Sequence, residues 1–213
     1  RVDFFALRLL DLGLKPGDTV ATLLVLVPEH LMLMYACFKI GVVIAPLDVR
    51  LKDDEVARDV ARIGARAFFF LGNTPVRDFR SAGARVREAC PTVQHLVQFT
   101  PNPGPGELLE GAVSITGLMA KSRLLWLKAR DLLTGGLKAA RARLHARTPA
   151  LIIFTTGTTG PPKPALLCHE NVVLQNQFLA LAMGLEGLLR SLVKVPPSFG
   201  CLVTERFIYT VFL

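Results

Sequence analysis

Residues 154–163 read Phe154-Thr155-Thr156-Gly157-Thr158-Thr159-Gly160-Pro161-Pro162-Lys163 and follow the apolar run Leu151-Ile152-Ile153. A short apolar run is typical of a buried strand, and open α/β sheets bind ligands beyond the carboxyl ends of their strands. The glycines allow a sharp turn, while the threonine hydroxyls, the backbone N–H groups and the Lys163 ammonium group can donate to phosphate oxygens. The stretch therefore predicts a loop that holds a polyphosphate.

This loop differs from the phosphate-binding loop of kinases and GTPases, which has the pattern G-x-x-x-x-G-K-[ST] and opens a helix. Here Pro161 and Pro162 separate Gly160 from Lys163, and Pro164 stands where Ser or Thr would hold a metal. Because prolines lack the N–H groups of a helix start, we expect a strand over residues 165–168. A P-loop phosphotransferase is thus disfavoured, and a Thr/Gly-rich turn without a ligand is the structural alternative.

The composition predicts a folded chain without disulfides. Of the 213 residues, 51% are apolar and 20% charged, which argues against disorder and allows one large domain or two small ones. The four cysteines are widely scattered without a C-x-x-C pair, as expected of a protein in the reducing cytosol. The longest apolar region, residues 31–47, contains Lys39 and Gly41 and predicts a buried helix and strand, because a spanning helix needs about 20 apolar residues.

Strand-like and helix-like segments alternate through the first half of the chain. Apolar runs at residues 20–27, 42–45, 67–71 and 95–99 alternate with helical patterns at residues 4–10, 28–40, 53–63 and 79–89. Such alternation predicts an α/β fold with a mostly parallel sheet and helices on both faces.

A Pro/Gly-rich loop at residues 100–106 interrupts this alternation and is followed by two expected helices, residues 118–133 and 137–146. Eight basic residues and one acid lie between Lys121 and Arg147, within a chain of net charge +8. Our functional hypothesis is peripheral contact of residues 121–147 with an anionic membrane or a substrate held there; the alternative is an inserted, solvated helix. We do not predict nucleic-acid binding, because the segment has few aromatic residues apart from Trp126.

Thr155 to Lys163 resembles the signature loop [ST]-[ST]-G-T-T-G-x-P-K-G of the adenylate-forming superfamily, which includes the acyl-CoA synthetases, and matches it at eight residues. Residues 13–21 and 39–47 resemble the scaffold patterns L-G-[VL]-x-x-G-D-x-V-A and K-x-G-A-V-x-x-P-L of the same superfamily. Pro164 departs from the pattern, because the family usually has glycine there. The resemblance implies the fold of the N-terminal large domain of acyl-CoA synthetases, in truncated form.

The resemblance also implies a domain organisation. Residues 1–213 correspond to an incomplete N-terminal AMP-binding domain: residues 1–99 form a βαβ scaffold, residues 100–148 the loop and basic helical insertion, and residues 149–213 the phosphate-loop region. The C-terminal domain, with the family's catalytic lysine, is expected to be absent. No catalytic residue is therefore assignable, and we expect these residues to be inactive alone.

The implied activity is the ATP-dependent activation of a carboxylic acid to an acyl adenylate, with Mg²⁺ as counter-ion, followed by thioester formation with coenzyme A. Phosphate binding is expected from Thr155, Thr156, Gly157, Thr158, Thr159, Gly160 and Lys163, with Thr156 or Thr158 as the candidate to reach Mg²⁺. A fatty or other apolar acid is the expected substrate. The alternatives are adenylation of an amino or aryl acid, or a catalytically dead nucleotide- or acyl-binding module. We expect a cytoplasmic protein that can associate with membranes.

Two further segments are assigned from the same resemblance. Pro197-Ser198-Phe199-Gly200 resembles the family's P-x-[FH]-H-x-x-G element, so Phe199 and Gly200 would border the acyl pocket, with Gly200 replacing the usual His; Phe199 could equally be a core aromatic. His169 is expected at a helix start, where a capping or packing role is favoured over that of a general base.

Overall fold

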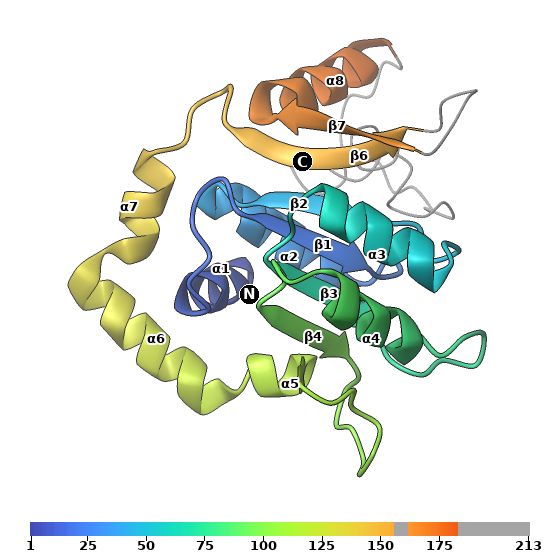
Figure 1. Ribbon diagram of the computed structural model, residues 1–213. Helices are drawn as coiled ribbons and strands as arrows, with labels where there is room; N and C mark the ends of the chain where they lie inside the picture. The colour runs from blue at the N-terminus through green and yellow to red at the C-terminus, as the bar shows by residue number, and fades with distance from the viewer. Residues whose placement is uncertain (156–161, 183–213) are drawn as a thin grey trace.

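A seven-stranded sheet forms the centre of the protein (Figure 1), in a computed structural model that describes residues 1–155 and 162–182. The strand order is β5-β4-β3-β1-β2-β6-β7. All neighbouring pairs are parallel except β6 and β7, which are antiparallel. The strands are β1 (Thr19–Leu23), β2 (Val43–Pro46), β3 (Ala67–Leu71), β4 (His95–Phe99), β5 (Ala112–Ser114), β6 (Pro149–Thr155) and β7 (Lys163–Cys168).

Helices cover both faces of this sheet, as the sequence predicts (Figure 1). One face is covered by α1 (Val2–Asp11) and α2 (Pro28–Ile40), and the other by α3 (Asp53–Arg62) and α4 (Arg80–Ala89). Because side chains alternate along a strand, Phe69 of β3 joins the core beneath α1 and α2, while Phe68 and Phe70 join the core beneath α3 and α4. The remaining helices are α5 (Ile115–Leu118), α6 (Lys121–Thr134), α7 (Gly136–Ala142) and α8 (His169–Ala182).

The boundaries of α2 follow from local chemistry. Pro28 begins the helix, where its missing N–H costs nothing, and Gly41 ends it in the left-handed conformation at φ 74°. A Cβ atom at position 41 would lie 2.9 Å from Leu144 Cδ2 and 3.2 Å from Pro16 Cβ. Gly41 therefore lets the end of α2 approach the chain that follows α7.

The structure differs from the sequence prediction at the end of the first strand. β1 stops at Leu23 instead of Val27, because the chain turns there toward α2 and the Val25 carbonyl lies 3.3 Å from His30 Nδ1. The apolar region 31–47 forms the buried part of α2 and β2, as expected. In the described part of the chain, no helix has the length and hydropathy needed to cross a membrane.

Residues 100–148 also contain elements that the sequence did not predict. β5 and α5 precede α6, and β5 pairs in parallel with β4 to extend the sheet. The expected helix 137–146 ends at Ala142, because His145 N donates to Thr148 Oγ1 in a turn that leads into β6. This segment is therefore an extension of the sheet edge as well as a pair of outer helices.

Candidate functional site

The predicted phosphate-binding loop joins two antiparallel strands. In the register of β6 and β7, Thr155 lies opposite Lys163, so the chain reverses direction between them. β6 also pairs in parallel with β2 through Leu151 and Ile44, which places the hairpin at the carboxyl edge of the parallel sheet. The strand expected after the prolines is confirmed, and it begins at Lys163.

Two contacts attach the base of this hairpin to the scaffold. Phe154 packs against the small core that contains Ala45 and Ile152. Arg62, at the end of α3, donates from Nη1 to the Pro162 carbonyl over 2.9 Å. The helix thus holds the exit of the loop directly before Lys163. Sequence reasoning missed Arg62, because an exposed arginine at a helix end has no pattern of its own.

The two predicted phosphate ligands that lie in the described residues have different surroundings. Thr155 Oγ1 donates to the Lys163 carbonyl over 3.2 Å, so its proton closes the hairpin and is not directed outward. The Lys163 side chain is exposed and forms no ion pair within residues 1–155 and 162–182. The Lys163 ammonium group is therefore not engaged by another described residue, and its role as a phosphate ligand stays a prediction. Thr156, Gly157, Thr158, Thr159, Gly160, Phe199 and Gly200 lie outside the described residues, and their roles stay predictions.

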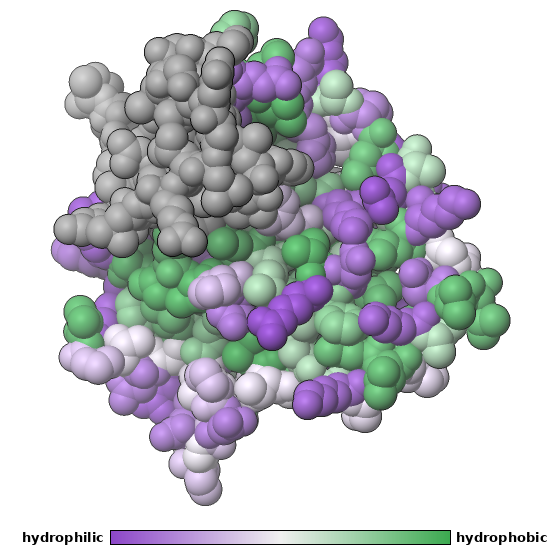
Figure 2. All heavy atoms as spheres, turned by 180° about the vertical axis from the view of Figure 1, so that it is seen from behind, coloured by the Kyte–Doolittle hydropathy of each residue, from purple (hydrophilic) through white to green (hydrophobic). Residues whose placement is uncertain are grey.

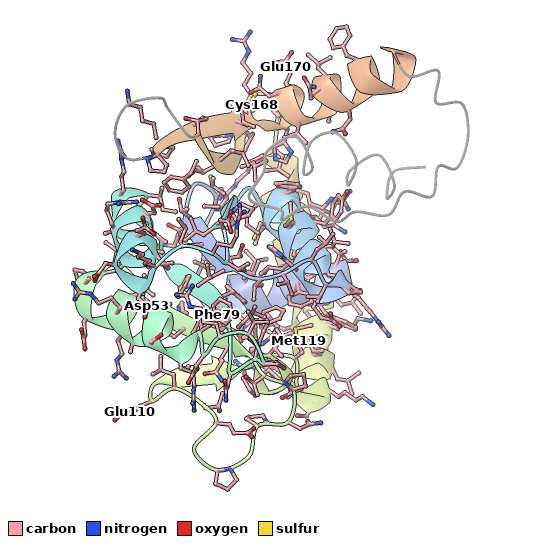
Figure 3. The ribbon with its side chains drawn as sticks, turned by 90° about the vertical axis from the view of Figure 1, so that its right-hand side faces the viewer. Asp53, Phe79, Glu110, Met119, Cys168 and Glu170 are labelled. Atoms are coloured by element: carbon pink, nitrogen blue, oxygen red, sulfur yellow. The ribbon has the colours of Figure 1, made fainter. Side chains whose placement is uncertain are left out.

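The start of α8 gives His169 a structural environment. Its ring meets the Phe38 ring edge-on at a centroid distance of 5.8 Å, and burial lowers the pKa of the imidazole, with a further contribution from His145. The helix start itself is held by Asn171 Oδ1, which accepts from Cys168 N over 3.0 Å. Figure 3 shows Cys168 and Glu170 on either side of this junction between β7 and α8. These contacts support the packing role of His169.

A separate apolar cavity of about 580 Å³ lies between α1, α2, α5 and the start of α6. Its walls include Phe4, Met32, Phe99, Ile115 and Met119, and none of the described lining residues belongs to β6 or β7. Figure 3 shows Met119 far from Cys168 at the end of β7. The cavity is therefore distinct from the candidate phosphate site.

The described residues contain no metal centre and no disulfide. Within residues 1–155 and 162–182, no group of three or more His, Cys, Asp or Glu side chains could hold a metal ion. Cys37, Cys90 and Cys168 are free thiols, and Cys201 lies outside the described range.

Comparison with known proteins identifies the family. The family model described as "AMP-binding enzyme" matches residues 1–210, so the chain belongs to the AMP-binding enzyme family. An acetyl-coenzyme A synthetase of Serratia proteamaculans is 30% identical over 172 residues, which cover 76% of this chain and 24% of the relative. The long-chain fatty acid transport protein 5 of Homo sapiens is 52% identical over 42 residues, which cover 20% of this chain and 6% of the relative.

Solved structures show the same fold. The crystal structure of a putative long-chain-fatty-acid CoA ligase from Rhodopseudomonas palustris superimposes with a TM-score of 0.68 at 20% identity, and the match covers 92% of this chain and 43% of the other. The predicted fold class is therefore confirmed. The chain spans about a quarter of the length of the acetyl-coenzyme A synthetases that it matches.

Proposed function

We propose that this chain is the nucleotide-phosphate-binding part of an enzyme that activates a carboxylic acid with ATP. In the first step a carboxylate oxygen attacks the α-phosphorus of ATP, the bond from that phosphorus to the bridging oxygen of the β-phosphate breaks, and pyrophosphate leaves; a bound Mg²⁺ would neutralise part of its charge. In the second step the sulfur of coenzyme A attacks the acyl carbonyl, loses its proton, and displaces AMP. The hairpin between β6 and β7, in a chain of the AMP-binding enzyme family, is the observation that supports this proposal most directly.

The residues of the hairpin have specific tasks in this proposal. Lys163 offers an exposed ammonium group to the β- and γ-phosphates, where it stabilises the negative charge that the leaving pyrophosphate gains. The glycines and threonines of residues 156–160 add backbone and hydroxyl donors. Arg62 holds the loop exit directly before Lys163 through the Pro162 carbonyl, which helps to position the lysine before the nucleotide arrives.

A fatty or other apolar acid is the proposed substrate. The support is the apolar side chain at Phe199, the leucine-rich basic segment and the similarity to a protein named for long-chain fatty acid transport. Other relatives are named for acetyl groups, so a substrate panel must include short, long, aryl and amino acids.

The decisive experiment is acid-dependent exchange of radiolabelled pyrophosphate into ATP, carried out with the full-length protein and with residues 1–213. We expect exchange with the full-length protein and none with residues 1–213, because the latter span about a quarter of the relatives' length. Nucleotide binding without exchange by the full-length protein would favour a catalytically dead binding module. Exchange with amino or aryl acids but not with fatty acids would overturn the proposed substrate class.

The role of Lys163 is tested by Lys163→Ala. Removing one charged hydrogen bond to phosphate costs about 1.5–3 kcal/mol, which corresponds to roughly 10- to 150-fold weaker binding of ATP by the full-length protein. The measurement is isothermal titration with Mg·ATP. Lys15→Ala is the matched control, because Lys15 is also exposed but lies in the turn before β1. Equal affinities for the two variants would remove Lys163 from the site.

A further inference from the structure

The outer surface of α6 differs from that of the other helices on the sheet. Leu124 and Leu127 are buried toward α1, whereas Leu125, Leu132 and Leu133 are 68%, 87% and 87% exposed and Trp126 is 49% exposed. Positions 125 and 132, like 126 and 133, are seven residues apart and thus share one side of a helix. We call these four residues the outer face of α6. A face of large apolar side chains in water indicates a binding surface.

Ion pairs and a cation–π contact attach α6 to α1. The exposure of its outer face therefore does not result from detachment of the helix. Arg123 Nη2 lies 3.0 Å from Asp11 Oδ1, and Arg130 Nη1 lies 3.5 Å from the same oxygen. The ammonium group of Lys128 lies 4.4 Å from the centroid of the Phe4 ring. These contacts with α1 leave the leucines of the outer face as the part of α6 that has no partner within the described residues.

Four exposed cations lie in the same segment of the chain as this apolar face, one at the start of α6 and three on or directly after α7. Lys121, Lys138, Arg141 and Arg143 are exposed and form no ion pair with any described residue. Asp131, the acidic residue of α6, accepts a hydrogen bond from Leu137 N over 2.7 Å. This hydrogen bond links the end of α6 to the start of α7. α6 and α7 form an outer arc of the molecule (Figure 1), and along the edge where this arc lies Figure 2 shows hydrophobic side chains next to hydrophilic ones.

We propose that the outer face of α6, together with the cations of α7, docks the protein on the surface of an anionic phospholipid membrane. The leucines would enter the acyl region, Trp126 would lie at the headgroup level, and the cations would meet lipid phosphates and carboxylates. A polyanion such as nucleic acid explains the cations but not the exposed leucines, and an apolar protein partner explains the leucines but not the unpaired cations. An anionic lipid surface would contact both the leucines and the cations. This inference is independent of the proposed reaction.

The test is co-sedimentation with phosphatidylcholine vesicles, with and without phosphatidylserine, at about 0.1 M and about 1 M salt. We expect binding only to the vesicles with phosphatidylserine and only at low salt. Equal binding to neutral vesicles, or binding that is insensitive to salt, would overturn the proposal.

Leucine variants test the apolar part of the surface. Leu132→Asp combined with Leu133→Asp should weaken vesicle binding at least tenfold, about 1.4 kcal/mol, without changing the unfolding midpoint, because both side chains are exposed. Val76→Asp is the matched control, since Val76 is 94% exposed but lies in the loop before α4. Unchanged binding by the leucine variant, or an equal loss in the control, would contradict the inference.

Charge variants test the electrostatic part. A triple change to glutamine at Lys138, Arg141 and Arg143 should weaken binding at least tenfold at low salt. The control is the same triple change to glutamine at Lys52, which directly precedes α3, and at Arg85 and Arg87 on α4. This control should leave vesicle binding unchanged. Binding of the leucine variant to heparin is measured as well. If that variant still bound both heparin and vesicles, the site would be a general polyanion site, and the membrane assignment would be overturned.

Discussion

At the scale of single residues, the carboxyl edge of the sheet is stabilised by a buried neutral histidine. His30 Nε2 lies 3.0 Å from Thr22 Oγ1, and His30 Nδ1 lies 3.3 Å from the Val25 carbonyl oxygen. Complete burial lowers the pKa of His30 from 6.5 to about 4. The imidazole therefore fixes the turn from β1 to α2 only in its neutral form.

This lowered pKa predicts a loss of stability in acid. As the pH falls below 6.5, the unfolded chain takes up a proton at His30, whereas the folded chain does not until about pH 4. The free energy of unfolding should therefore fall over this range by up to about 3 kcal/mol because of this group. Urea unfolding measured at several pH values checks the slope.

His30→Gln should remove that contribution to the slope. The exposed His145 provides the control, and His145→Gln should keep the acid-induced loss. Identical pH slopes in the original protein and in His30→Gln would show that the buried histidine does not control acid stability.

At the level of single residues, the sequence motif predicts phosphate ligands, but it does not predict the hydrogen bonds at the base of the loop. The Thr155 hydroxyl is predicted to bind phosphate; in this structure it donates to a carbonyl on the facing strand, a contact that sequence spacing cannot reveal. Arg62 was missed because its partner, the Pro162 carbonyl, is 100 positions away in sequence. Lys163 was assigned from its position in the motif, and its exposed side chain is compatible with that role.

At the scale of elements, α3 supports the hairpin through one charged donor. Arg62→Ala should weaken Mg·ATP binding by the full-length protein about fivefold, since one hydrogen bond contributes about 1 kcal/mol. Arg62→Lys should recover part of the affinity, because the ammonium group can donate to the same carbonyl. Isothermal titration measures both.

Arg85→Ala is the control for this prediction. Arg85 forms an exposed ion pair with Asp54 on the same layer of helices, and its loss should leave ATP affinity unchanged. If Arg62→Ala bound ATP as tightly as Arg85→Ala does, the loop exit would not depend on α3.

Elements with strong patterns were predicted best. β3 and β4 have the bounds that their apolar runs indicate, because long-range pairing and burial on both faces agree with the local pattern. β5 is three residues long and exposes Val113, so it has no sequence pattern, and its pairing with β4 creates the strand. The end of α7 was overestimated because a side-chain hydrogen bond in the following turn is invisible to helix periodicity.

At the scale of the whole molecule, the two proposed surfaces lie on different sides. In Figure 1 the carboxyl end of β6 points to the right, whereas α6 and α7 lie on the left. A membrane bound to α6 would therefore lie on the side opposite the carboxyl end of β6. Nucleotide and membrane could be bound at the same time.

Asp11 attaches this outer arc to the body of the protein. Its carboxylate accepts from Arg8 of α1 and lies within ion-pair distance of Arg123 and Arg130 of α6. Asp11→Asn should lower the free energy of unfolding by about 2–3 kcal/mol, because it leaves the largely buried Arg8 without its charge partner. Urea unfolding gives the magnitude, and amide hydrogen exchange should show faster exchange in α6.

Asp54→Asn is the comparison for Asp11. The Asp54 side chain is exposed, so losing its ion pair with Arg85 should cost less than about 1 kcal/mol. Equal destabilisation by the two variants would show that Asp11 does not anchor the arc.

The position of Trp126 has a practical consequence. It is the single tryptophan in the chain, and its indole ring lies between the guanidinium groups of Arg123 and Arg130 at 4.5 and 4.7 Å. All intrinsic indole emission therefore originates on the outer face of α6. A shift of that emission to shorter wavelength when vesicles are added would report contact optically, without attaching a dye.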